Sequence, residues 1–181
     1  MSQRDPFQHL LDEARADQAV DARIRERLLR QAAEESARLS GVLTDLVEQH
    51  PVVTVRCASG NQHQGRLLTV ASDHVVVRNR DGLDVHVALD EIVLVRPEPS
   101  LRFPAATGDR PAPTDRTLHQ VLTRVVGDRP RIAVVARGGG APIAADLRSV
   151  GEDVATLVLD GSGDTAYLAT AAIAELTILD T

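Results

Sequence analysis

Two hydrophobic patterns divide the chain at Pro51. Before Pro51, apolar residues recur at helical spacings, for example the step of four from Ile24 to Leu28. Ser40-Gly41 interrupts this pattern with residues that favour a bend or a break. The pattern therefore predicts a helical arm over residues 1–41 and a shorter helix that leads into the next region.

After Pro51 the chain changes to short, valine-rich runs separated by turn residues, which is typical of the strands of a small closed barrel. In the middle hairpin the expected turn is Arg80-Asp81-Gly82, with Gly82 suited to a left-handed conformation. This register places Arg78 opposite Asp84, a favourable pair of charges. It also places four valines on one core-facing side: Val75, Val77, Val85 and Val87.

The second part of the chain begins with a break in the periodicity. Residues 98–114 are rich in proline and predict an extended linker. A new helical pattern follows, which Thr114 or Asp115 can cap, and strand-like runs return at Arg131. The expected domains are the arm (1–41), a first barrel with its leading helix (42–97), the linker (98–114) and a second barrel with its leading helix (115–181).

An internal repeat relates the two predicted barrels. The segment Leu43–Val53 matches Leu122–Ile132 at an offset of 79 residues. The stretch Gly65–Asn79 matches Ala145–Leu159 at an offset of 80, with leucine, valine and aspartate agreeing at three positions. The repeated unit is therefore a helix, a proline corner and five short strands. Only three residues are aromatic, so an aliphatic core is expected in both copies.

The repeat resembles the Sm and Sm-like (LSm) small β-barrel. The first Sm motif runs through an apolar strand, two glycines, an apolar pair and an aspartate, and this order is supplied by Val55, Gly60, Gly65, Leu67, Val70 and Asp73. The second copy supplies Val135, Gly140, Leu147, Val150 and Asp153, with Ala145 in place of the second glycine. The chain also resembles a group of actinobacterial proteins with a helical arm and two Sm-like halves, for which no activity is established. The resemblance implies an α+β fold in which the arm precedes two Sm-like or SH3-like barrels, each a helix plus five strands.

The base-binding residues of the Sm family are absent from both copies. In Sm proteins an asparagine four residues after the motif aspartate binds a base, but Val77 and Leu157 stand at these positions. The late segments also lack the arginine-glycine pair that completes that pocket. We therefore expect neither copy to keep the usual uridine pocket.

The charge of the chain limits the class of partner. A formal net charge of −6 argues against broad electrostatic capture of a phosphate backbone. A local basic edge on the first barrel remains a candidate for weak nucleic-acid contacts, and it consists of Arg56, Arg66, Arg78 and Arg80.

The sequence predicts no catalytic, cofactor-binding or metal-binding site. The single cysteine, Cys57, is interpreted as structural. His74 and His86 could face one side with Asp84 as metal ligands, but neither they nor His63 have a repeat partner, so surface histidines are expected. Five residues are interpreted as structural turn positions, with local backbone hydrogen bonds expected from both aspartates: Gly60, Asp73, Gly82, Gly140 and Asp153.

These patterns together favour a non-enzymatic interaction or scaffold module that self-associates or docks a protein partner. The alternative is an RNA- or DNA-binding regulator that uses the basic edge of the first barrel. No small-molecule substrate is expected. No membrane partner is expected either, because no apolar run reaches the length of a membrane span. A charged N-terminus and a lone cysteine favour the cytoplasm.

Overall fold

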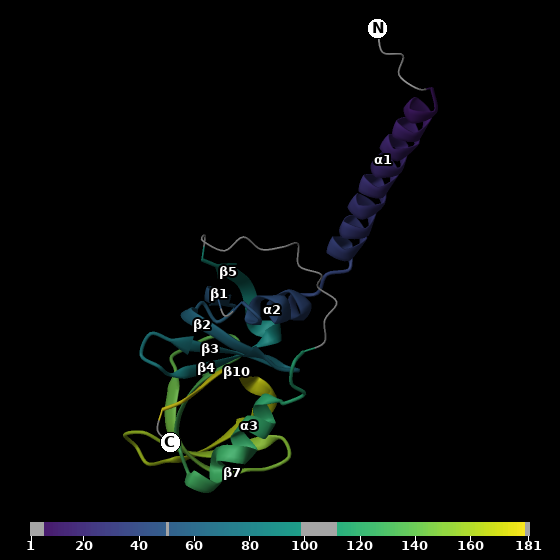
Figure 1. The fold of residues 1–181 in the computed structure, drawn as a ribbon. Coiled ribbons are helices and arrows are strands. Elements are labelled where there is room, and N and C mark those ends of the chain that lie inside the picture. The colour runs from purple at the N-terminus through teal and green to yellow at the C-terminus, as the bar shows by residue number, and fades with distance from the viewer. Residues whose placement is uncertain (1–5, 50, 99–111, 180–181) are drawn as a thin grey trace.

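A computed structural model describes residues 6–49, 51–98 and 112–179 (Figure 1). The helices are α1 (Pro6–Glu35), α2 (Leu39–Val47) and α3 (Leu118–Val125), with short 3-10 turns at Leu89–Glu91 (η1), Val126–Asp128 (η2) and Thr170–Ala172 (η3). Helix α1 projects away from the strands, whereas α2 and α3 each lie against them. The predicted linker over 98–114 falls mostly on 99–111, which lie outside the described residues.

The break between the first two helices lies at residues 36–38, a little before the predicted Ser40-Gly41. The break separates an exposed helix from a buried one. The residues of α1 from Asp21 onward are almost all exposed, but Leu43 and Leu46 of α2 are buried in the core. Ser40 and Gly41 therefore lie inside α2.

All ten strands belong to one antiparallel sheet with the order β5-β1-β2-β3-β4-β10-β6-β7-β8-β9. The first half contributes β1 (Val52–Cys57), β2 (Gln62–Val70), β3 (His74–Asn79), β4 (Asp84–Ala88) and β5 (Ile92–Pro97). The second half contributes β6 (Arg131–Ala136), β7 (Ile143–Val150), β8 (Val154–Leu159), β9 (Thr165–Ala169) and β10 (Ile173–Ile178). The internal repeat is visible in this order, because the fifth strand of each half pairs with the first strand of that half.

The prediction of two separate Sm-like or SH3-like small barrels in tandem is wrong. Strand β4 of the first half pairs with β10 of the second, with Val87 opposite Glu175 and Val85 opposite Thr177. Without β10, the outer backbone N–H and C=O groups of β4 would lack partners, and β10 supplies them. The result is one open ten-stranded sheet with three helices instead of two closed five-stranded units.

Each half nevertheless has its own aliphatic core, as the composition predicts. In the first half Leu43 of α2 is fully buried with Leu67 of β2 in one hydrophobic cluster. In the second half Leu122 of α3 and Leu147 of β7 occupy the matching places in another cluster. Thr117 is the N-cap of helix α3 and forms a capping box with Gln120, so the predicted cap at Thr114 or Asp115 is wrong.

The predicted hairpin between β3 and β4 is confirmed. Arg78 lies opposite Asp84 and donates two hydrogen bonds to its carboxylate, at 2.7 and 2.8 Å. Val75 and Val77 pair with Val87 and Val85, as the register requires. In the turn, the Asn79 side-chain oxygen accepts from the N–H groups of Asp81 and Leu83.

Candidate functional site

A buried polar cluster joins the two halves where β10 meets the first half, and we call this cluster the seam. Its centre is the carboxylate of Glu175, which is 3% exposed. The carboxylate accepts hydrogen bonds from Ser59 Oγ at 2.5 Å and from Asn61 Nδ2 at 3.0 Å, and it lies 2.8 Å from His63 Nε2. Burial alone would raise the pKa of Glu175, but the hydrogen bonds from His63, Ser59 and Asn61 lower it to about 2. Glu175 is therefore an ionised and fully partnered group.

Cys57 lies beside this carboxylate at the end of β1. Burial raises the pKa of its thiol to about 12, and the negative charge of Glu175 adds to the effect. A thiol of this kind is protonated at neutral pH and is a poor nucleophile. The buried position agrees with the structural role predicted for Cys57.

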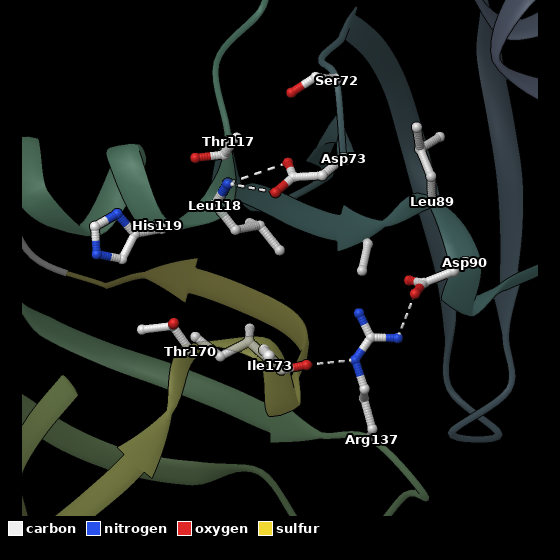
Figure 2. Close-up of a pocket in the computed structure, with 12 residues that line it drawn as sticks. Ser72, Asp73, Leu89, Asp90, Thr117, Leu118, His119, Arg137, Thr170 and Ile173 are labelled. Carbon is white, nitrogen blue, oxygen red and sulfur yellow. Dashed lines mark hydrogen bonds and ion pairs between the residues drawn. The ribbon is translucent and has the colours of Figure 1, made fainter. Parts of the chain in front are cut away.

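A second junction between the halves surrounds a cavity of about 520 Å³ (Figure 2). Arg137, from the second half, donates to Asp90 Oδ2 at 2.7 Å and to the carbonyl oxygen of Ala171 at 2.7 Å. Asp73, from the first half, accepts at 3.1 Å from the backbone N–H of Leu118, the first residue of α3. These charged side chains pair with one another or with the backbone, so they hold the halves together.

The two motif aspartates have different roles. The side chain of Asp73 reaches 45 residues along the chain to Leu118, so the predicted local turn is wrong for this carboxylate. Asp153 is exposed, and no hydrogen bond to its carboxylate occurs among the described residues. What the two share is a backbone contact, because their carbonyl oxygens accept from Leu89 and Thr170 respectively. The predicted turn glycines Gly60, Gly82 and Gly140 all have positive φ angles, of 92°, 83° and 126°.

Three of the four predicted arginines lie together. Arg66, Arg78 and Arg80 line a hollow of about 430 Å³, whereas Arg56 is not among its lining residues. Asp84 already holds the guanidinium of Arg78, and the hydrogen bond between them raises the pKa of Arg78. Arg80 donates to the side chain of Gln64 at 3.0 Å, and Glu98 adds a negative charge to the same hollow.

The histidines of the first half are less exposed than predicted. His74 is 2% exposed, its Nδ1 lies 2.7 Å from Asp73 Oδ1, and its ring centroid is 5.1 Å from that of His86. His86 is partly buried, and this burial lowers its pKa to about 4. The prediction of surface histidines is wrong for His74, because its ring is enclosed between the Asp73 carboxylate and the ring of His86.

The sheet ends on each side in a strand with one unpaired edge. Strand β5 pairs with β1 alone and β9 with β8 alone. Apolar side chains are exposed on these two strands: Val93 by 68%, Leu94 by 48% and Tyr167 by 76%. The sequence predictions missed these residues and the cluster around Glu175. The available signal in the sequence was Glu175 itself. It is a charged residue inside the apolar run of β10, and its repeat counterpart in β5 is Leu94.

No family model matches the chain, and no curated protein is significantly similar to it. The resemblance to Sm-like proteins therefore stays a prediction. Within the part of the chain that the structure describes, no helix combines the length and the apolar character needed to cross a bilayer. The seam and the two free edges are the features of the structure that bear on function.

Proposed function

We propose that this protein is a non-enzymatic self-association module, in which β9 of one chain pairs with β5 of the next. The observation that carries the proposal is a contrast between repeat-related residues. Strands β4 and β9 begin at 84 and 165, and β5 and β10 begin at 92 and 173, so both pairs are related by 81 residues. Ala174 and Glu175 of β10 are 0% and 3% exposed, whereas their counterparts Val93 and Leu94 of β5 are 68% and 48% exposed.

The internal pairing of β4 with β10 supplies the register for the pairing between chains. Inside the chain Glu175 lies opposite Val87, Leu176 opposite His86, and Thr177 opposite Val85. Shifting each residue by the 81 positions of the repeat gives three intermolecular pairs: Leu94 with Leu168, Val95 with Tyr167, and Arg96 with Ala166. Main-chain hydrogen bonds would then complete both free edges.

The side chains at the internal pairing of β4 with β10 differ from those at the proposed pairing of β9 with β5. This difference explains why the second pairing forms between chains. At the seam, Glu175 meets polar groups of Ser59, Asn61 and His63. At the matching outer position Leu94 would meet the counterparts of these residues 80 positions on, which are Gly139, Ala141 and Ile143. A buried carboxylate without its polar partners is costly, so β10 fits only the first half, while the apolar β5 fits the second half of another chain.

This contact is heterologous, since the two surfaces that meet are different. Such a contact builds a ring where the rotation between chains closes and a filament where it does not.

The arm offers a second site of contact between chains, because three apolar side chains of α1 are exposed by 51% to 66%: Ile24, Leu28 and Leu29. A scaffold of this kind needs no catalytic group, and the paired charges around the cavity in Figure 2 fit that role.

The proposal is tested by measuring molecular mass against concentration with light scattering. We expect the wild-type mass to rise with concentration, and Leu94→Lys to weaken the association at least tenfold because a charge would be buried in the contact. Leu39→Lys, at a leucine of α2 that is 43% exposed, is the matched control and should keep the association. A monomeric wild type, or loss of association in Leu39→Lys alone, would overturn the pairing of edges.

A second candidate function is nucleic-acid binding, because Arg66, Arg78 and Arg80 line one hollow. Its weakness is that Asp84 and Glu98 offset part of the positive charge. Fluorescence anisotropy with a short single-stranded RNA tests it. Binding that falls steeply with salt and is lost in Arg66→Ala/Arg80→Ala would support this function, and an association mass that is unchanged by nuclease would favour the first proposal.

We also propose a cytoplasmic location, since Cys57 is a free thiol.

A further inference from the structure

Three side chains with different metal-binding atoms converge at the seam. Cys57 Sγ, a nitrogen of His63 and a carboxylate oxygen of Glu175 all lie within 4.8 Å of one another. They come from the neighbouring strands β1 and β2 and from β10, which pairs with β4 and β6 and meets the first two strands through these side chains. Zinc in a tetrahedral site holds such atoms about 3 to 4 Å apart, a separation that follows from bond lengths of about 2.0 to 2.3 Å. Small side-chain movements therefore bring the three atoms to coordinating distance.

The surroundings of these three atoms are those of a supported ligand set. Ser59 and Asn61 donate to the carboxylate of Glu175 and fix its orientation, as outer partners of metal ligands do. Glu91 adds a second negative charge that acts on Cys57, and its Oε2 atom is buried without a hydrogen-bond partner among the described residues. Arg137 donates to the other oxygen of Glu91 at 3.2 Å and offsets part of this charge, and a cation at the cluster would offset more of it.

A route from solvent to the cluster exists. A hollow of about 290 Å³ opens beside it and is lined by residues of both halves, among them Asn61, His63, Pro142, Glu175 and Thr177. His63 is partly exposed at this opening, whereas Cys57 and Glu175 are buried behind it. The hollow leaves room for a water molecule as a fourth ligand.

We propose that Cys57, His63 and Glu175 bind a divalent transition-metal ion of the zinc type. The thiol proton passes to solvent when the sulfur binds the ion, and water fills the remaining coordination position. The ion would link β10 to the β1–β2 hairpin and so fasten the two halves. The repeat-related residues are Arg137, Ile143 and Leu94, none of which is a zinc ligand of this type, so the site belongs to the internal seam alone.

Calorimetric titration of the reduced protein with Zn²⁺ tests the proposal, with Co²⁺ as a spectroscopic probe of the same site. We expect one ion per chain and a thiolate-to-cobalt charge-transfer band. Cys57→Ser should abolish the band, and His63→Asn should weaken zinc binding at least about tenfold, as loss of a ligand or of its support does. His119→Asn, which changes a histidine of α3, is the matched control and should bind zinc like the wild type.

Circular dichroism of each variant shows whether it remains folded. His63 is partly exposed, so His63→Asn keeps the test valid even where a change at Glu175 prevents folding. The proposal is overturned if the folded wild type binds no Zn²⁺, if the cobalt complex lacks the thiolate band, or if Cys57→Ser binds zinc as tightly as the wild type.

Discussion

The carboxylate of Glu175 lies 2.8 Å from the imidazole Nε2 of His63, although 112 positions separate them in the chain. This contact joins β10 of the second half to β2 of the first. At the matching outer positions Leu94 and Ile143 are both apolar. The two halves are therefore joined by a polar contact inside the chain, while the repeat-related positions on the edge strand β5 and on β7 are apolar.

Replacing Glu175 by leucine tests how much the seam stabilises the fold. Glu175→Leu leaves Ser59, Asn61 and His63 without their acceptor, so we expect the free energy of unfolding to fall by about 2 kcal/mol or more. Urea denaturation in a chelator-containing buffer measures this value apart from any effect of metal. Glu152→Leu, at an exposed glutamate, should change it by about 0.5 kcal/mol or less. Equal effects of the two changes would contradict the role given to the seam.

His86 predicts a loss of stability in mild acid. Burial, and then the nearby His74, lower its pKa from 6.5 to about 4, whereas Asp84 acts in the opposite direction. The unfolded chain therefore takes up a proton at higher pH than the folded one, and stability falls as the pH drops from about 6.5 towards 4.

The measurement for His86 is the free energy of unfolding at several pH values between 7 and 4. We expect the wild type to lose on the order of 1 to 3 kcal/mol more than His86→Gln across this window. His119→Gln should follow the wild-type curve. Parallel curves for the wild type and His86→Gln would show that His86 does not titrate as described.

The two motif aspartates provide a matched pair of mutations. Asp73→Ala removes the acceptor for the first N–H group of α3, so we expect a loss of about 1 to 2 kcal/mol, the usual cost of removing a helix cap. Asp153→Ala removes an exposed carboxylate and should cost much less. Thermal or urea unfolding measures both values, and an equal loss would mean that the contact with Leu118 contributes little.

Local parts of the fold were predictable because neighbouring residues determine them. Gly82 and Asn79 shape the turn between β3 and β4, and the alternating valines then fix which residues face the core. The repeat also predicted a helix followed by five strands in each half, which the structure contains. In each of these cases the residues that decide the structure lie within one hairpin or one repeat.

The pairing of β4 with β10 could not be predicted in this way. It depends on a match between Glu175 and three residues more than 110 positions earlier, and local periodicity carries no sign of such a match. The contact of Asp73 with α3 was missed for a related reason. The repeat suggested that Asp73 and Asp153 are equivalent, but α3 donates its first N–H group to Asp73, whereas it meets the second turn through His119 and the Gly151 carbonyl.

The register between chains can be tested by disulfide formation. Arg96→Cys and Ala166→Cys in the same chain should give covalent dimers and larger species on mild oxidation, because directly opposed residues have Cα atoms about 4.5 to 5.5 Å apart. Arg96→Cys with Tyr167→Cys is the control, since this pair is out of register by one residue and should cross-link poorly. Cys57 does not compete, because it is buried and the pKa of its thiol is about 12.

The most direct test of head-to-tail association is to mix two chains that are each blocked at one edge. Leu94→Lys leaves β9 free to pair, and Tyr167→Lys leaves β5 free. Sedimentation velocity should show each variant alone as a monomer and the mixture as a dimer that grows no further. A mixture that stays monomeric, or variants that still associate alone, would contradict the pairing of β9 with β5.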